Sequence, residues 1–181
     1  LKSPWLMFHV AVIVGAYGFF GISCLIGLTN LVMMSVSGEK NSVMLKERVR
    51  ELSIVNEMSL WIGLALMTIG TFLGAVWANE SWGRYWGWDP KETWALITMV
   101  VYAFIPHARF LPVLRSDYAF SVMSVLGLAS VLMTYFGVNY YLSGLHSYGG
   151  GDTPPGLTAV FITYACAFAL MIYAGYSQRK Q

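Results

Sequence analysis

The chain has 181 residues, of which 57% are hydrophobic and only 11% are charged, whereas soluble domains carry about 25% charged residues. The net charge is +2, and the basic residues form no long tract of the kind that binds nucleic acid. Cys24 and Cys166 both lie in apolar stretches, and no Cys-x-x-Cys occurs. This excludes a disulfide framework, a thioredoxin-like site and a self-attached c-type haem. The composition therefore predicts a membrane protein with no nucleic-acid partner.

Five apolar segments are expected to cross the membrane as helices, because a crossing needs about 20 predominantly apolar residues and none of the segments alternates with a period of two. They cover residues 4–34, 54–77, 93–106, 118–141 and 156–176. The first is longer than a span requires, so we expect it to tilt or to project from the bilayer. The third is short and needs residues from the preceding loop. The predicted fold class is an all-α, polytopic membrane helix bundle that forms one membrane domain over residues 1–181.

Basic residues in the short connections predict the orientation, since they concentrate on the cytoplasmic side. The first set of connections carries Lys40, Lys46, Arg48, Arg50, Arg109, Arg115, Arg179 and Lys180, and the second carries only Lys2, Arg84 and Lys91. We therefore expect the loop 35–53, the turn near residue 110 and the C-terminus in the cytoplasm. The N-terminus, the loop 78–92 and the loop 142–155 are then expected outside.

The start of the chain bears on its origin. Residue 1 is Leu1, and no cleavable signal peptide precedes the first span. Because the N-terminus is expected outside, we expect residues 1–181 to be the C-terminal part of a longer polypeptide.

Five of the seven tryptophans lie within one short stretch: Trp77, Trp82, Trp86, Trp88 and Trp94. Tryptophan at a membrane interface is ordinarily an anchor, which would account for two or three of these rings. It accounts poorly for a cluster interleaved with glycines. Glycine lets the backbone approach a flat partner, and the rings offer a large aromatic surface. The loop 78–92 is therefore predicted to be a platform for a planar ligand.

The end of this loop resembles a helix start. In Asp89-Pro90-Lys91-Glu92, Asp89 is expected to be the N-cap, Pro90 the first helical residue, and Glu92 the residue that returns a hydrogen bond to the cap. Capping is thus the first role expected of Asp89 and Glu92. A firmly capped helix would also hold the tryptophan loop rigidly.

The three histidines are candidate iron ligands. His9 lies at the outer end of the first span and His146 just past the outer end of the fourth, so both are predicted on the side of the tryptophan loop. His107 lies about 18 residues beyond Asp89 along the third span, or about 27 Å at 1.5 Å per residue. It therefore cannot share an iron with the outer pair. It is either a structural histidine or one ligand of a second, inner site.

The run Trp82-Gly83-x-x-Trp86-x-Trp88-Asp89-Pro90-Lys91-Glu92-Thr93-Trp94 resembles the tryptophan-rich "WWD" signature of haem-handling proteins of the CcsA/ResC type in System II cytochrome c synthases. The motif is long and highly specific. His107 in Pro-His-Ala-Arg and His146 in Leu-His-Ser-Tyr also resemble the CcsA pattern, as does His9 at the head of a span. The similarity covers essentially the whole chain.

The resemblance implies the following roles. Haem b would be held by Trp82, Gly83, Trp86, Trp88, Asp89 and Trp94, with His9 and His146 as external axial ligands. His107 would belong to an inner haem site whose partner ligand lies outside this chain, used while haem is passed outward. The protein would join haem covalently to the Cys-x-x-Cys-His motif of apocytochrome c, with Asp89 and Glu92 as candidate catalytic residues.

The resemblance also implies a partner and a place. A CcsB-type partner, fused or separate, would work with the chain in the bacterial inner membrane, with the site on the outer face, or in the thylakoid membrane of a plastid. The main alternative is a haem exporter that loads a haem chaperone without synthase activity. An electron-transfer cytochrome would need facing histidine pairs within the spans, and a structural subunit would use the aromatic rings only as an interface belt.

Overall fold

The computed structural model describes residues 3–37, 42–145 and 156–179. Its elements are α1 (Pro4–Val36), α2 (Ser42–Trp82), α3 (Pro90–Ala108), α4 (Asp117–Leu132), the π-helical turn η1 (Met133–Gly137), α5 (Val138–Tyr141) and α6 (Leu157–Arg179). The described part of the chain contains no strand, so the all-α prediction is confirmed. Among the described residues, four segments are long and apolar enough to cross a membrane: α1, α2, the continuous run from α4 to α5, and α6. The third predicted span corresponds to α3, which has 19 residues and is not one of these four.

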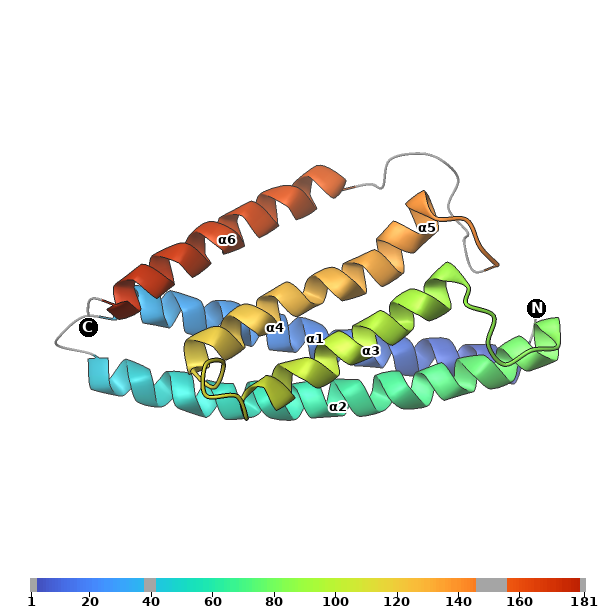
Figure 1. The fold of residues 1–181 in the computed structure, drawn as a ribbon, viewed down its shortest axis with the longest axis horizontal. Helices are drawn as coiled ribbons and strands as arrows, with labels where there is room; N and C mark the ends of the chain where they lie inside the picture. The colour runs from blue at the N-terminus through green and yellow to red at the C-terminus, as the bar shows by residue number, and fades with distance from the viewer. Residues whose placement is uncertain (1–2, 38–41, 146–155, 180–181) are drawn as a thin grey trace.

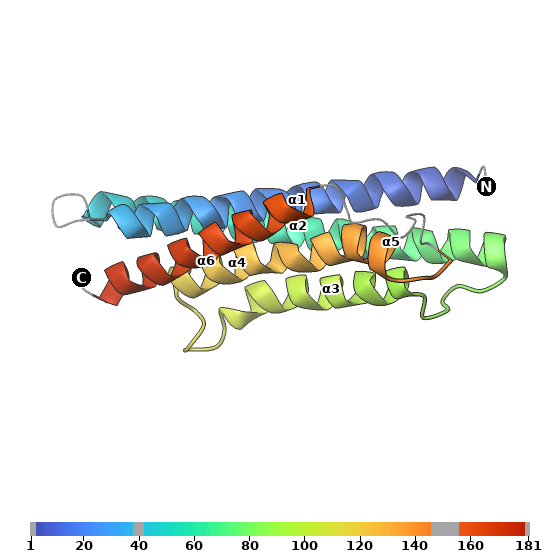
Figure 2. The same cartoon turned by 90° about the horizontal axis from the view of Figure 1, so that it is seen from above.

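The helices form an elongated bundle built on an antiparallel hairpin of α1 and α2. Helices α3 and α4 lie along this hairpin, and α6 lies beside α1 and α4 (Figures 1 and 2). Helix α1 begins at the end of the bundle where α2 passes into α3, and α6 finishes at the other end. We call the first end, which carries residues 83–89 and 142–145, the loop end. The end that carries residues 109–116 is the opposite end.

Small residues let α1 and α2 pack closely. A Cβ added at Gly63 would lie 2.6 Å from the Phe20 ring, and one added at Gly70 would lie 2.7 Å from Ile13 Cδ1. Gly74 makes the equivalent contact with His9. The contacts move back along α1 as they move forward along α2, as an antiparallel pair requires. Glycines at such spacings are typical of close helix packing in membranes.

Polar and aromatic contacts join this hairpin to α3 and α4. The Phe20 and Tyr102 rings stack with centroids 3.5 Å apart. Between the helices, the Asn56 amide donates to Ser124 Oγ at 3.0 Å, and both side chains are buried. Hydrogen bonds of this kind hold membrane helices together in the absence of a hydrophobic driving force between them.

The predicted loop boundaries need correction at both ends of α2. Residues 42–53 are helical, although the loop 35–53 was expected there, because this stretch contains no glycine or proline and is rich in good helix formers. The external loop was expected over residues 78–92, yet α2 runs on to Trp82 and α3 begins at Pro90. The loop proper is therefore the seven residues 83–89.

Arg109, one of the basic residues predicted for the cytoplasmic side, forms ion pairs near the opposite end. Arg109 contacts Glu57 of α2 at 3.5 Å and Asp117 of α4 at 3.4 Å. Its guanidinium also lies 4.6 Å from the centre of the Phe120 ring. Arg109 thus ties the end of α3 and the start of α4 to the side of α2. Which end faces the cytoplasm stays a prediction from the distribution of charge.

Candidate functional site

The tryptophan loop is held at both ends by local backbone chemistry. Gly83 has a left-handed backbone, with φ +70°, and its N–H donates to the Asn79 carbonyl at 2.9 Å. A left-handed glycine is a common way to end a helix. At the other end, Asp89 caps α3 and Pro90 follows as its first residue, with a complete capping box. The capping prediction is therefore confirmed.

Both candidate catalytic carboxylates accept backbone hydrogen bonds. Asp89 is 6% exposed, and its Oδ1 accepts from Lys91 N at 3.0 Å. Glu92 Oε2 accepts from Gly87 N at 2.8 Å and from Asp89 N at 3.2 Å. These bonds to backbone N–H groups fix the conformation of the loop. Both residues thus have a structural role in the loop, and their catalytic role stays a prediction.

The tryptophans divide into buried and accessible rings. Trp77 is 1% exposed, and its ring meets that of Trp82 edge to face at 4.8 Å. Trp86 and Trp88 form a second edge-to-face pair at 5.7 Å. Trp94 is half-buried in α3. Trp88 is 69% exposed and has φ +57°, a left-handed conformation that costs a residue with a side chain roughly 1–2 kcal/mol. The loop thus holds one large ring outward in a strained conformation.

His9 lies at the loop end, on the side of α1 that faces α2. Its Nδ1 is 2.6 Å from the Gly70 carbonyl oxygen. A Cβ added at Gly74 would lie 2.6 Å from Cε1 and 2.7 Å from Nδ1 of the same ring. The imidazole therefore occupies the space that a side chain at Gly74 would take. Because a carbonyl oxygen only accepts, Nδ1 must carry the proton, and the lone pair that can bind a metal is on Nε2.

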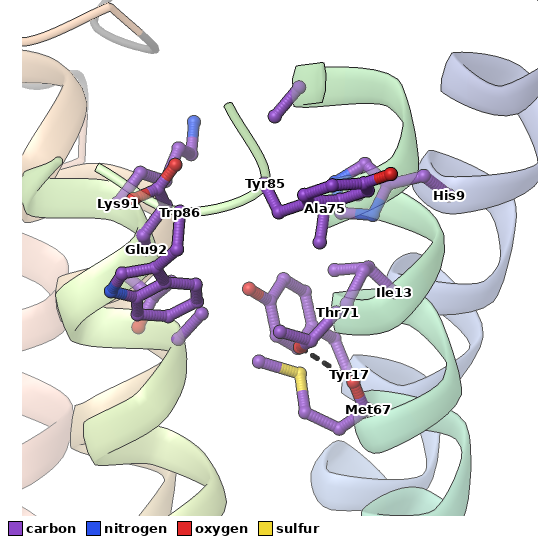
Figure 3. A pocket seen from close by; sticks show the side chains of 14 residues that line it. His9, Ile13, Tyr17, Met67, Thr71, Ala75, Tyr85, Trp86, Lys91 and Glu92 are labelled. Carbon is purple, nitrogen blue, oxygen red and sulfur yellow. Dashed lines mark hydrogen bonds between the residues drawn. The ribbon is translucent and has the colours of Figure 1, made fainter. Parts of the chain in front are cut away.

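A cavity of about 100 Å³ lies between the α1–α2 hairpin and the start of α3. Figure 3 shows His9 and Tyr17 on the hairpin side and Trp86 on the side of α3, with Tyr85 extending from the loop toward the hairpin. Lys91 and Glu92 also line it. The predicted ligand His9 and the predicted platform residue Trp86 thus meet at one cavity.

The segment 142–145 is attached to the start of α3. Leu145 N donates to Asp89 Oδ2 at 2.6 Å, and Lys91 Nζ donates to Asn139 Oδ1 at 2.9 Å. A Cβ added at Gly144 would overlap Asp89 Oδ2. The structure therefore brings the second predicted external loop, in its described part, against the tryptophan loop. The next residue, His146, lies outside the described residues.

His107 lies at a different level of the bundle. Its ring contacts that of Trp61 edge to face at 5.3 Å, and its Nδ1 is 2.7 Å from the Ala103 carbonyl. On α2, His107 contacts Trp61 and His9 contacts Gly74. These two α2 residues are about 20 Å apart along the helix, at 1.5 Å per residue. The structure thus supports the separation of His107 from the outer site. His107 is exposed on the bundle surface, with the same nitrogen turned to a backbone carbonyl as in His9.

Several residues of the site were missed from sequence. Tyr17 and Tyr85 line the cavity, and Asn139 and Leu145 contact the start of α3. The spacing of Gly70 and Gly74 could have indicated a close helix approach opposite His9. No local signal could have paired Leu145 with Asp89, because 56 positions separate them.

Comparison with known proteins agrees with this architecture. Residues 1–146 match the family described as Cytochrome C assembly protein. The chain is 52% identical over 155 residues to Protein NrfI of Wolinella succinogenes, a match that covers 86% of this chain and 17% of NrfI. It is 38% identical over 169 residues to the cytochrome c biogenesis protein CcsA of Guillardia theta, covering 82% of this chain and 55% of that protein. The CcsA of Chlamydomonas reinhardtii is 37% identical over 151 residues, covering 82% of this chain and 42% of the relative.

The chain thus spans about half the length of the CcsA relatives and a smaller share of NrfI. The family match covers most of the chain, and the Guillardia theta relative is more than 30% identical over most of it. The chain belongs to the cytochrome c assembly protein family, and within its sequence it is similar to the CcsA proteins of cytochrome c biogenesis.

Proposed function

We propose that this chain binds haem b at its loop end, with His9 and His146 as the axial ligands and the tryptophan loop as the supporting surface. The observation that carries the proposal is the placing of His9. Its Nδ1 is bound to the Gly70 carbonyl at 2.6 Å, and it lines a cavity that Trp86 also lines. A backbone carbonyl on one ring nitrogen fixes the tautomer and the ring orientation, and it raises the basicity of the other nitrogen.

The surroundings of His9 fit an apolar, flat substrate. The cavity offers the Tyr85 and Trp86 rings beside the imidazole, and the Trp88 ring is exposed next to them. Aromatic rings stack favourably on a flat conjugated surface. The exposed Tyr85 and Trp88 rings are available to a partner or to the membrane interface, which supports a ligand at this end of the bundle.

In the whole protein, we propose that the bound haem is joined to the Cys-x-x-Cys-His motif of an apocytochrome c. Each thiol adds across one vinyl group: a carbon–sulfur bond forms, the vinyl double bond becomes single, and the thiol hydrogen ends on the neighbouring carbon. The addition needs no oxidant. The chain's contribution is to hold the vinyl edge where the two thiols can reach it, since positioning alone can accelerate a reaction strongly. Asp89 and Glu92 serve by shaping the loop.

The further roles rest on the same proposal. His107 is proposed as one ligand of an inner haem site used while haem passes outward, because its Nδ1 is bound to a backbone carbonyl as in His9. Its partner ligand would come from outside this chain. The chain is proposed to work with a CcsB-type partner. It would lie in a bacterial inner membrane or a thylakoid membrane, with the loop end on the outer face.

The first test is the visible spectrum of the full-length protein, purified in detergent, in oxidised and reduced form. His9→Ala, His146→Ala and the double variant are compared with wild type, and His107→Ala reports separately on the proposed inner site. We expect a low-spin, six-coordinate spectrum that is lost in each outer variant and is restored when imidazole is added. Haem that is absent, or unchanged when both outer histidines are removed, would contradict the external site.

The second test separates a synthase from an exporter. The full-length protein is produced together with an apocytochrome c in cells that lack their own cytochrome c assembly proteins, and haem that stays attached in a denaturing gel is measured. Covalent haem on the apocytochrome in the absence of a haem chaperone supports the synthase. Haem transfer to a chaperone without any covalent product would favour the exporter instead.

A further inference from the structure

The start of α3 and the segment 142–145 meet at a single buried carboxylate. Asp89 is 6% exposed. Its Oδ1 accepts from Lys91 N at 3.0 Å, its side chain also accepts from Glu92 N in the capping box, and its Oδ2 accepts from Leu145 N at 2.6 Å. One oxygen therefore serves the helix to which Asp89 belongs, and the other serves a segment that follows α5.

The helix cap by itself does not require an aspartate. Asparagine caps helices about as well, through its single carbonyl oxygen. An amide, however, has only one acceptor atom, whereas an ionised carboxylate accepts with both oxygens and donates with neither. Asp89 therefore has an acceptor oxygen for the cap and another for Leu145, whereas an asparagine would place a donating NH2 group where one of these oxygens accepts.

The packing around this carboxylate is shaped to admit the segment. A Cβ added at Gly144 would overlap Asp89 Oδ2 and would lie 2.8 Å from Pro90 Cδ, so only glycine allows the backbone this close. A second bond, from Lys91 Nζ to Asn139 Oδ1 at 2.9 Å, ties α3 to α5 just before the segment. Two independent contacts thus hold the segment at the start of α3.

We infer that Asp89 is a positioning residue of the haem site, which sets the place of the segment 142–145 relative to the tryptophan loop through its bond to Leu145. The inference rests on the proposed function. The tryptophan loop ends at Asp89, and the segment leads directly into His146 in the sequence. A bond between them keeps the aromatic surface and the second ligand-bearing segment at one spacing, so that both can engage the same haem. Asp89 acts through Leu145 and the loop, not on the reacting atoms.

The test uses a double-mutant cycle in the full-length protein. Asp89→Asn leaves one acceptor oxygen for three backbone donors, those of Lys91, Glu92 and Leu145, and Leu145→Pro removes the donating N–H while Asp89 stays intact. Leu145→Ala is the matched control, because it removes the side chain and keeps the N–H. Haem affinity is measured by absorbance titration, together with the coordination spectrum and the midpoint potential of the haem, and thermal melting follows the fold.

We expect Asp89→Asn and Leu145→Pro each to weaken haem binding about tenfold, the effect of one charge-assisted hydrogen bond, and to move the midpoint potential. The double variant should be no worse than Asp89→Asn, because both changes remove the same bond. Leu145→Ala should resemble wild type. Gly144→Ala, which displaces the segment without removing a polar group, should repeat the loss if proline perturbs the backbone too widely.

Two results would overturn the inference. In the first, Leu145→Pro and Gly144→Ala bind haem as tightly as Leu145→Ala does. In the second, the losses of affinity in Asp89→Asn and Leu145→Pro multiply in the double variant. The proposed function is judged separately, by wild type against His9→Ala. If wild type holds no haem through His9, both ideas fail. If it does and the variants at residues 144 and 145 are silent, the inference alone fails.

Discussion

The His9 ring lies against Gly74, in the space that any side chain at that position would occupy. The same ring binds the Gly70 carbonyl through Nδ1. Gly70 and Gly74, one turn apart on α2, therefore determine both the tautomer and the position of the predicted iron ligand. This relationship leads to the first of four predictions.

Gly74→Ala should displace His9 from its place. The added Cβ would lie 2.6 Å from the imidazole, and overpacking of this kind costs about 1–3 kcal/mol. We expect the haem spectrum of the full-length protein to change from six-coordinate to five-coordinate. Gly21→Ala is the control, because a Cβ there meets nothing within 4 Å. An unchanged spectrum in Gly74→Ala would show that His9 is not the ligand or that α1 and α2 can separate.

Glu92→Ala should loosen the tryptophan loop. The change removes the acceptor of two backbone bonds, from Gly87 N and Asp89 N, and should cost about 1–2 kcal/mol of local stability. Hydrogen exchange of the loop amides should become faster, while exchange elsewhere is unaltered. Ser116→Ala is the matched control, since it removes the cap of α4 at the opposite end. Loop exchange that does not change would mean that the capping box contributes little.

Trp88→Gly should separate stability from binding. Glycine removes the cost of the left-handed backbone at φ +57°, worth about 1 kcal/mol, so thermal stability should be kept or slightly raised. Haem affinity should fall about tenfold, because the exposed ring no longer supports the substrate, at about 1–1.5 kcal/mol for an aromatic contact. Trp88→Phe should keep most of the affinity. Equal haem affinity in wild type and Trp88→Gly would mean that the ring is an interface anchor.

Arg109→Met should weaken the opposite end of the bundle. The guanidinium joins Glu57 to Asp117 and lies over the Phe120 ring, so its loss should lower the free energy of unfolding by about 1–3 kcal/mol. The melting temperature in detergent measures this loss. Arg115→Met, at an exposed position of the same turn, should have little effect. Similar melting of the two variants would show that the Arg109 contacts are not significant for stability.

The sequence by itself determined the class of the protein and the local structure around the tryptophans. Long apolar runs predict membrane helices because the bilayer leaves backbone groups no other partner. The order Asp89-Pro90-Lys91-Glu92 predicts the start of α3 because all four residues act within one helical turn, and the structure has this capping box. The start of α2 was placed too late for a related reason. Hydropathy marks the part of a helix that crosses lipid, and the charged residues 42–53 continue the same helix beyond it.

The tertiary structure alone decided which of these parts meet. His9 finds its carbonyl at Gly70, 61 positions away, and Asp89 finds Leu145, 56 positions away. The periodicity of a helix relates residues that are a few positions apart in the same helix. These two pairs depend instead on how closely α1 packs on α2 and on where the chain runs after α5. Gly74 and Gly144 are informative only once the neighbouring side chain is known. The sequence therefore supplied the candidate ligand His9 and the aromatic residues, and the packing of α1 on α2 and of residues 142–145 on α3 brought His9, the tryptophan loop and the segment 142–145 to the same end of the bundle (Figure 1).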